Sequence, residues 1–305
     1  MKEKKAKFVQ TFRNISSIFV IRNNNDKKRY VREIKADEVV ISGNKVQVSF
    51  LAPELDAYDL RTLIILLADV NMNKKALEIW EALGNGIELA KKLNFKIDPM
   101  KESDFSKIIR YETKWSDLLE KLGLAYQTRN IDRLKQTLKY LQSSLVTLTI
   151  KDEKTNRTKL ELTSSLLMYQ LDISPENNKN NRVFLVFNPL FYLIAFGKTI
   201  LKSTINMEVF QKLFEKDANM SIVYYVLCDN VNFGEKKEFM LDDIEYACYG
   251  NVSSDKSTKS RRRKFLLDTL QEIEKLSNRS FIIKVMEDKI RVRRIPDRKN
   301  VKQES

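Results

Sequence analysis

The chain has 305 residues, 43% of them hydrophobic, with 7 Gly and 5 Pro, which favours a folded protein with one or two ordinary cores. Its formal net charge is +14 and it contains no histidine. The lack of histidine excludes the metal-holding histidine pair of rolling-circle nickases, and the positive charge favours nucleic acid as the partner.

Several other classes are disfavoured. Cys228 and Cys248 lie in apolar contexts without a second cysteine pair, which predicts neither a zinc site nor a disulfide framework. The longest apolar run, residues 183–200, is interrupted by two polar dipeptides, so we expect no membrane span and a cytoplasmic protein. The Gly84-Asn85-Gly86 segment lacks the spacing of a P-loop. We expect no cofactor and no metal.

Charge is segregated along the chain. The net charge is +8 for residues 1–35, −4 for 36–105, +6 for 106–160, −4 for 161–256 and +8 for 257–305. Such blocks are typical of a protein in which particular elements contact a polyanion such as nucleic acid. The alternative explanation is that the lysine-rich faces are only solvated.

Residues 1–35 are predicted to be a basic N-terminal arm with a turn at residues 23–26, and residues 36–173 a first domain. Hydrophobic periodicity and turn residues predict the elements of this domain in chain order. They are a hairpin of residues 39–41 and 46–50, helices at 55–70, 76–83 and 87–93, a short helix at 114–122, a long helix at 128–143, and strands at 145–150 and 160–171.

The short and long helices predict a helix-turn-helix. Gly123 stops the short helix, and Ile131, Leu134, Leu138 and Leu141 fall on one face of the long one. The two following strands flank a polar turn and read as a hairpin, or wing.

The same order of elements returns after residues 174–182, a Pro-, Asn- and Lys-rich stretch that predicts a linker. A second domain at 183–297 and a tail at 298–305 would follow. The predicted elements are a strand at 183–187, helices at 207–214, 220–230, 241–249 and 257–276, and a hairpin at 281–295. We therefore predict an α+β, mainly helical chain of two tandem winged-helix domains.

A basic cluster at the start of the second long helix is the strongest candidate site. In a winged helix this helix enters the major groove and the wing contacts the backbone, and a helix N-terminus favours anions. The candidates for DNA contact in this domain are Lys259, Ser260, Arg261, Arg262, Arg263 and Lys264 on the helix, with Arg291, Arg293 and Arg294 on the wing.

The first domain gives a weaker signal, because spaced charges on an exposed helix are common in proteins that bind nothing. The candidates are Arg129, Arg133, Gln136 and Lys139 on the helix, with Lys154 and Arg157 on the wing.

Groups that could carry catalysis have simpler explanations. Asp242-Asp243 opens a helix, where negative charge favours the helix dipole, so we expect capping and not magnesium binding. Tyrosine nucleophiles for a nickase are read as packing residues; they are Tyr111, Tyr224, Tyr225 and Tyr246. We expect no enzyme, with a tyrosine nickase or a primase as the alternative.

The chain resembles the plasmid replication initiators of the RepC type found in IncQ-like replicons, over most of residues 36–297. The segments that carry the resemblance are FLVFNPL at 184–190, INME at 205–208, YACYG at 246–250, SRRRK at 260–264, RIP at 294–296 and, in the first half, 53–66 with DLR at 59–61.

The resemblance implies a two-winged-helix initiator that binds directly repeated sites, or iterons, in duplex DNA at a plasmid origin and helps to open the adjacent AT-rich segment. It implies that a separate helicase and primase act at the origin, and dimerisation through the first domain is a hypothesis. A transcriptional repressor would use the same residues, and the sequence does not separate the two.

Overall fold

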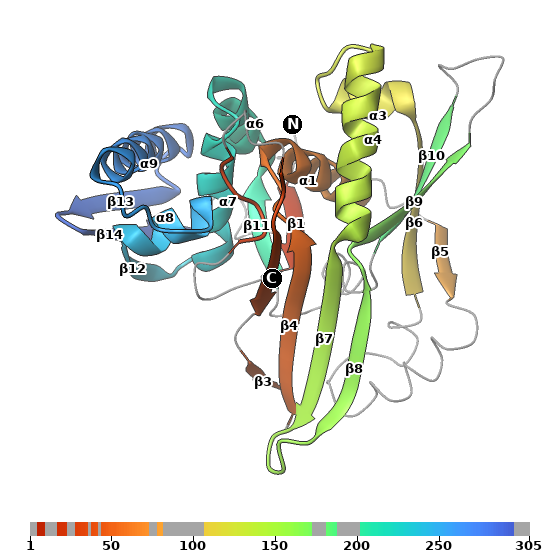
Figure 1. The fold of residues 1–305 in the computed structure, drawn as a ribbon, viewed down its shortest axis with the longest axis horizontal. Helices are drawn as coiled ribbons and strands as arrows, with labels where there is room; N and C mark the ends of the chain where they lie inside the picture. Colours follow the sequence, from red (N-terminus) through yellow and green to blue (C-terminus); the bar gives the residue numbers. More distant parts are fainter. Residues whose placement is uncertain are drawn as a thin grey trace.

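The computed structural model describes residues 5–9, 17–22, 28–35, 38–41, 44–72, 78–81, 107–172, 181–187 and 202–295. Within these ranges the chain is α+β, with seven helices and four sheets whose named strands all pair antiparallel (Figure 1). The turn predicted at 23–26, the helix predicted at 87–93 and the tail at 298–305 lie outside the described residues.

The largest sheet is a long ribbon that extends away from the helices (Figure 1). Its strands run in the order β2-β4-β7-β8, with β3 paired to β4. Strand alternation buries Val46, Val48 and Phe50 on one face, as the period of two requires. The strands are β2 (Val31–Lys35), β3 (Val39–Ile41), β4 (Asn44–Pro53), β7 (Leu145–Asp152) and β8 (Thr158–Ser165).

A second sheet, in the order β5-β6-β10-β9, corrects the predicted domain boundary. Its strands are β5 (Glu78–Glu81), β6 (Lys107–Lys114), β9 (Leu167–Asp172) and β10 (Arg182–Phe187). Because β9 pairs with β10 from Leu167 to Asp172, the strands on the two sides of the predicted linker belong to one sheet. Residues 174–180 of that linker lie outside the described residues. The helix predicted at 76–83 is wrong, since β5 lies there.

Three helices cover these sheets: α1 (Ala57–Met72), α3 (Trp115–Lys121) and α4 (Thr128–Ser143). The predicted stop at Gly123 is confirmed by its φ of 62°, a conformation that favours glycine. Leu134, Leu138 and Leu141 are buried on α4 as predicted. The helix pair of the first half is therefore present, and it packs between two extended sheets.

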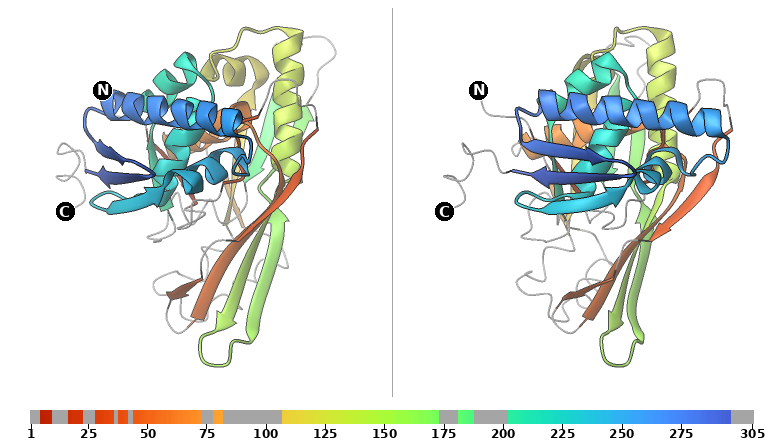
Figure 2. Two further views of the ribbon diagram at one scale, coloured as in Figure 1. Left: turned by 60° about the vertical axis from the view of Figure 1, so that its left-hand side comes forward. Right: turned by 90° about the vertical axis from the view of Figure 1, so that its left-hand side faces the viewer.

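The second half is built around α7 (Met220–Asn230), which is buried from Ser221 onward. Around it lie α6 (Met207–Lys216), α8 (Leu241–Tyr249), α9 (Lys256–Leu276) and a sheet in the order β12-β14-β13, formed by β12 (Lys236–Met240), β13 (Phe281–Met286) and β14 (Lys289–Arg294). Tyr224 of α7 packs edge-on against Phe281 of β13 at 5.8 Å. The short helix, long helix and hairpin follow one another as predicted (Figure 2).

The N-terminal region is part of the core. β1 (Lys5–Val9) pairs with β11 (Lys202–Asn206), which joins the N-terminal strand to the strand that precedes α6. Ile18, Phe19 and Val20 are buried, and the backbone N–H of Ile21 donates to the carbonyl of Cys248 at 2.6 Å. Residues 1–35 are therefore not a separate arm in their described part.

The predicted fold class is corrected accordingly. Long antiparallel strands, from Val31 to Arg294, contribute as much of the architecture as the helices, so the chain is α+β but not mainly helical. Tandem winged helices do not describe a first half in which the helix pair contacts both a long ribbon and a four-stranded sheet. Within the described residues, every helix is too short or too polar to span a bilayer.

Candidate nucleic-acid interface

Helix α9 has a well-defined start. Asp255 is its N-cap, and the carboxylate accepts a hydrogen bond from the backbone N–H of Thr258 at 2.6 Å. The preceding helix α8 ends at Gly250, whose φ is 77°. The residues between Gly250 and Asp255 therefore fix the direction in which α9 leaves the core.

Two cations of the basic cluster form ion pairs within the fold. Lys259 and Arg263 both bind Asp242 in the first turn of α8, at 2.9 and 2.8 Å. Arg263 also binds Asp288, in the turn between β13 and β14, at 2.8 Å. These contacts tie α8, α9 and the hairpin together, and they occupy the Asp242 carboxylate.

Acid is expected to loosen this corner of the fold. The hydrogen bond from Arg263, together with that from Lys259, lowers the pKa of Asp242 below its usual value. A lowered pKa stabilises the fold above the unfolded-state pKa, and that contribution is lost as pH falls through the folded-state pKa. We expect the free energy of unfolding to decrease below about pH 4, and Asp242→Asn to remove part of that decrease. Urea unfolding followed at several pH values tests this; the same pH dependence in both proteins would contradict it.

Arg262 points toward the core. It donates to Glu245 at 3.1 Å and to the side-chain oxygen of Asn251 at 2.8 Å, and its guanidinium lies 4.3 Å from the ring centroid of Tyr249. Glu245 is 0% exposed. A buried carboxylate needs a charged or hydrogen-bonding partner, so Arg262 stabilises the fold.

The rest of the cluster faces solvent. Ser260, Arg261 and Lys264 are exposed, and neither Arg261 nor Lys264 has a hydrogen bond or ion pair to any described residue. Lys256, Ser260 and Lys264 recur at every fourth residue and so form one exposed row along the helix, with the exposed Arg261 beside it. We call Lys256, Ser260, Arg261 and Lys264 the α9 face.

The three hairpin candidates differ in position. Arg291 binds Glu238 of β12 at 2.7 Å, and Arg293 is exposed. Arg294 is 3% exposed and donates to the backbone carbonyls of Thr204, Cys228 and Val231. The prediction that Arg294 contacts DNA is therefore wrong.

Arg294→Met is expected to lower the free energy of unfolding by about 2 kcal/mol, because methionine fills part of the space but leaves buried carbonyls unpaired. Chemical denaturation measures this, with Arg293→Met as the exposed control. A loss no larger than that of the control would show that the carbonyl contacts contribute nothing.

The first-half candidates lie on two other surfaces. Arg129, Gln136 and Lys139 are exposed on α4, whereas the Arg133 guanidinium lies 3.2 Å from the ring centroid of Tyr58. Lys154 and Arg157 are exposed at the tip of the β7–β8 hairpin. Figure 1 shows α6, α7 and α1 between α9 and α4, and the hairpin tip at the far end of the ribbon. The structure therefore does not gather the candidates into one patch.

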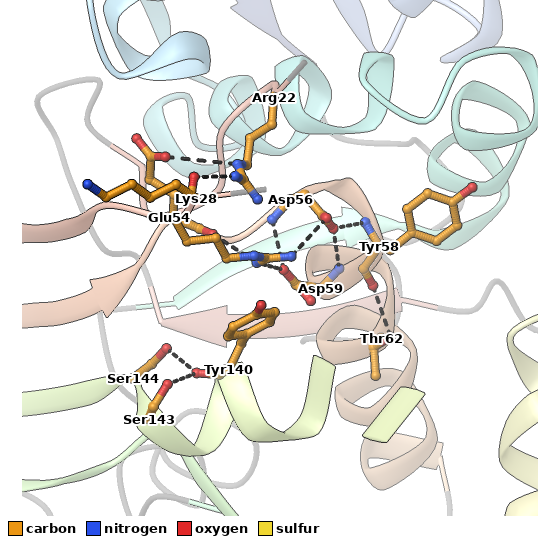
Figure 3. Close-up of polar contacts among 11 residues, drawn as sticks. Arg22, Lys28, Glu54, Asp56, Tyr58, Asp59, Thr62, Tyr140, Ser143 and Ser144 are labelled. Atoms are coloured by element: carbon orange, nitrogen blue, oxygen red, sulfur yellow. Dashed lines mark hydrogen bonds and ion pairs between the residues drawn. The ribbon is translucent and has the colours of Figure 1, made fainter. Parts of the chain in front are cut away.

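Arg29, in the basic N-terminal region, has a structural role. Arg29 donates to Asp56 at 3.0 Å, to Asp59 and to the carbonyl of Glu54 at 2.8 Å, and it lies 3.8 Å from the ring centroid of Tyr140 (Figure 3). Asp56 and Asp59 also accept backbone N–H groups at the start of α1. Arg29 thus joins the N-terminal segment to α1 and α4. The D-x-x-D spacing was the only sequence signal for this site.

The tyrosines considered as nucleophiles are mostly inaccessible. Tyr111, Tyr224 and Tyr225 are buried, and burial raises the pKa of Tyr111 and Tyr224. Tyr246 is exposed. Among the described residues, no group of three or more His, Cys, Asp or Glu side chains is placed to hold a metal ion.

No protein-family model and no curated protein sequence matches this chain. Two crystal structures of domains 2 and 3 of RctB are similar to it. A selenomethionine derivative has a TM-score of 0.44 and 12% identity, covering 91% of this chain and 95% of that chain. The other has a TM-score of 0.44 and 12% identity, covering 88% of this chain and 93% of that chain.

Proposed function

We propose that this chain binds double-stranded DNA through the α9 face and acts as a plasmid replication initiator at directly repeated sites. The observation that supports DNA binding is that the cations of α9 fall into two groups with different surroundings. Lys259, Arg262 and Arg263 hold the helix on the fold, whereas the α9 face presents unpaired cations to solvent. A rigidly held helix with a free basic face is suited to the major groove.

Other surfaces would add phosphate contacts. Arg293 on the hairpin is exposed, as are Arg129 and Lys139 on α4 and Lys154 and Arg157 at the ribbon tip. Contacts of this kind position a protein on DNA without reading its sequence. The net charge of +14 favours association with any duplex, so the α9 face must supply the preference for one site.

The role at an origin rests on the sequence resemblance to RepC-type initiators. In this proposal the protein binds iterons, promotes opening of the neighbouring AT-rich segment and works with a replicative helicase and primase. It catalyses no reaction itself and uses no cofactor. Homodimer formation belongs to the same proposal.

Binding to a labelled fragment with the direct repeats near this gene, against shuffled duplex at physiological salt, tests the proposal. A preference of about a thousandfold, with shifted species that match the number of repeats, is the expected result. Equal, steeply salt-dependent binding to both fragments would overturn site recognition.

Two further measurements separate the alternatives. Permanganate reactivity of origin thymines should rise when protein is added; tight, specific binding without it would indicate a repressor. Incubation of supercoiled origin plasmid with protein and magnesium or manganese should leave it supercoiled. A relaxed or covalently linked product would indicate a nickase.

A further inference from the structure

The outer face of the β12-β14-β13 sheet carries a regular array of cations. The strand register places Lys236, Arg293 and Ile282 in one row and Glu238, Arg291 and Lys284 in the next. A third row holds Met240, Lys289 and Met286. Because alternate residues of a strand share a face, all three rows point to the same side, away from the buried Ile290 and Val292.

This face has far more positive than negative charge. Lys236, Lys284, Lys289 and Arg293 are exposed and make no hydrogen bond or ion pair with any described residue. The one carboxylate in these rows, Glu238, accepts from Arg291 at 2.7 Å, and this hydrogen bond lowers its pKa. We call Lys236, Lys284, Lys289, Arg291 and Arg293 the sheet cations.

The sheet cations differ from the basic cluster of α9 in how their charge is compensated. On α9, Asp242, Glu245 and Asp288 pair with the inward cations. On the sheet, the side chains behind the cations are core residues such as Phe239 and Val292, which offer no carboxylate. Like charges on neighbouring strands repel one another, so an external polyanion would stabilise this face.

The geometry also suits an extended polyanion. Lys289, Arg291 and Arg293 follow one another at every second residue of β14, about 7 Å apart. Lys284 and Lys236 flank them on the neighbouring strands, about 5 Å to either side. The backbone hydrogen bonds of the sheet fix the positions from which these side chains project.

We propose that the sheet cations form a second DNA-binding surface, which holds the phosphate backbone of duplex DNA without reading its sequence. This inference rests on the proposed function and extends it from the single hairpin residue Arg293 to the whole outer face of the sheet. Helix α9 and the β12-β14-β13 sheet lie next to each other (Figure 2), and each turns its buried residues, Leu270 of α9 and Val292 of β14 among them, to the core, so the α9 face and the sheet cations lie on separate outer surfaces. When α9 lies in the major groove of one DNA segment, the sheet cations therefore remain available to bind the phosphate backbone of another stretch of DNA.

The variant K284A/K289A/R293A tests this surface. Its three side chains are exposed and unpaired, so its thermal unfolding should match that of the wild type. Each lost phosphate contact reduces the slope of log affinity against log salt by about 0.9. Between about 50 and about 200 mM salt, the variant should therefore lose roughly 40-fold less affinity than the wild type. The loss of affinity should be equal on repeat-containing and shuffled duplex.

Two controls sharpen the result. The conservative variant K284R/K289R/R293K should keep the wild-type slope. Glu238→Gln frees Arg291 and should steepen the slope by about one contact. An unchanged slope in K284A/K289A/R293A, in a protein whose wild type binds DNA, would overturn this inference alone. Loss of binding to polyglutamate with DNA binding unchanged would also overturn it, in favour of an acidic protein partner. A wild type that binds no DNA would instead overturn the proposed function.

Discussion

Replacing Arg262 with alanine is expected to lower the free energy of unfolding by about 3–5 kcal/mol. The guanidinium is the charged partner of Glu245, whose side chain is 0% exposed. Its removal leaves a carboxylate inside the fold without a counter-ion, and it also removes the contact with the ring of Tyr249. Urea unfolding followed by circular dichroism measures the change.

The matched control for this variant is Arg261→Ala. Arg261 is the preceding residue of the same helix, with an exposed side chain, so its replacement should change stability by less than about 0.5 kcal/mol. In the double variant R262A/E245Q the carboxylate is neutralised, and we expect about half of the loss to be recovered. A loss below about 1 kcal/mol in Arg262→Ala would mean that water replaces the guanidinium.

The basic cluster of residues 259–264 could be predicted from the sequence only in part. Its composition predicted a nucleic-acid contact, but not which cations are free. Glu245 lies 17 residues from Arg262, and Asp288 lies 25 residues from Arg263. Only the packing of α8 and the hairpin against α9 brings these partners together. The buried stripe of Leu266, Leu270 and Ile273 nevertheless separates the two groups of cations. Those on the side of the stripe form ion pairs within the fold, and those on the other side are exposed.

The hairpin cations could have been sorted from the sequence. In β14, Ile290 and Val292 are apolar and alternate with Lys289, Arg291 and Arg293, so the period of two already places Arg294 on the inner side. The same alternation, extended to Lys284 and Lys236, would have pointed to the sheet cations. What it could not show is the register that aligns the strands into rows.

The helices were predicted better than the sheets for a physical reason. The apolar period of α4 is local, and its bounds agree with the prediction. The pairing of β1 with β11 joins residues about two hundred positions apart, and no local pattern reports it. The stretch 174–182 has the composition of a linker, yet it joins strands that pair with each other, because polar turn residues suit both roles.

The second large effect is expected at the α9 face. The double variant R261A/K264A should bind repeat-containing duplex about 100-fold more weakly than the wild type, with little change in stability. An arginine that contacts a guanine edge contributes about 1–3 kcal/mol of discrimination, and a lysine on phosphate adds a smaller, salt-dependent share. Neither side chain has a partner in the fold that its removal would leave unpaired. Fluorescence anisotropy with repeat-containing and shuffled duplexes measures both affinities.

The ratio of the affinity for repeat-containing duplex to that for shuffled duplex distinguishes base reading from phosphate contact. If Arg261 reads a base edge, the R261A/K264A variant should lose its preference for repeats, and its affinity for shuffled duplex should fall by much less. Removal of sheet cations should weaken both affinities equally. Arg262→Ala provides the contrast, because the loss of its contact with Glu245 acts through folding: at temperatures where that variant is folded, it should retain the preference. A double variant that lost affinity equally on both duplexes would show that the α9 face grips phosphate alone, and the reading of sequence would then lie elsewhere in the protein.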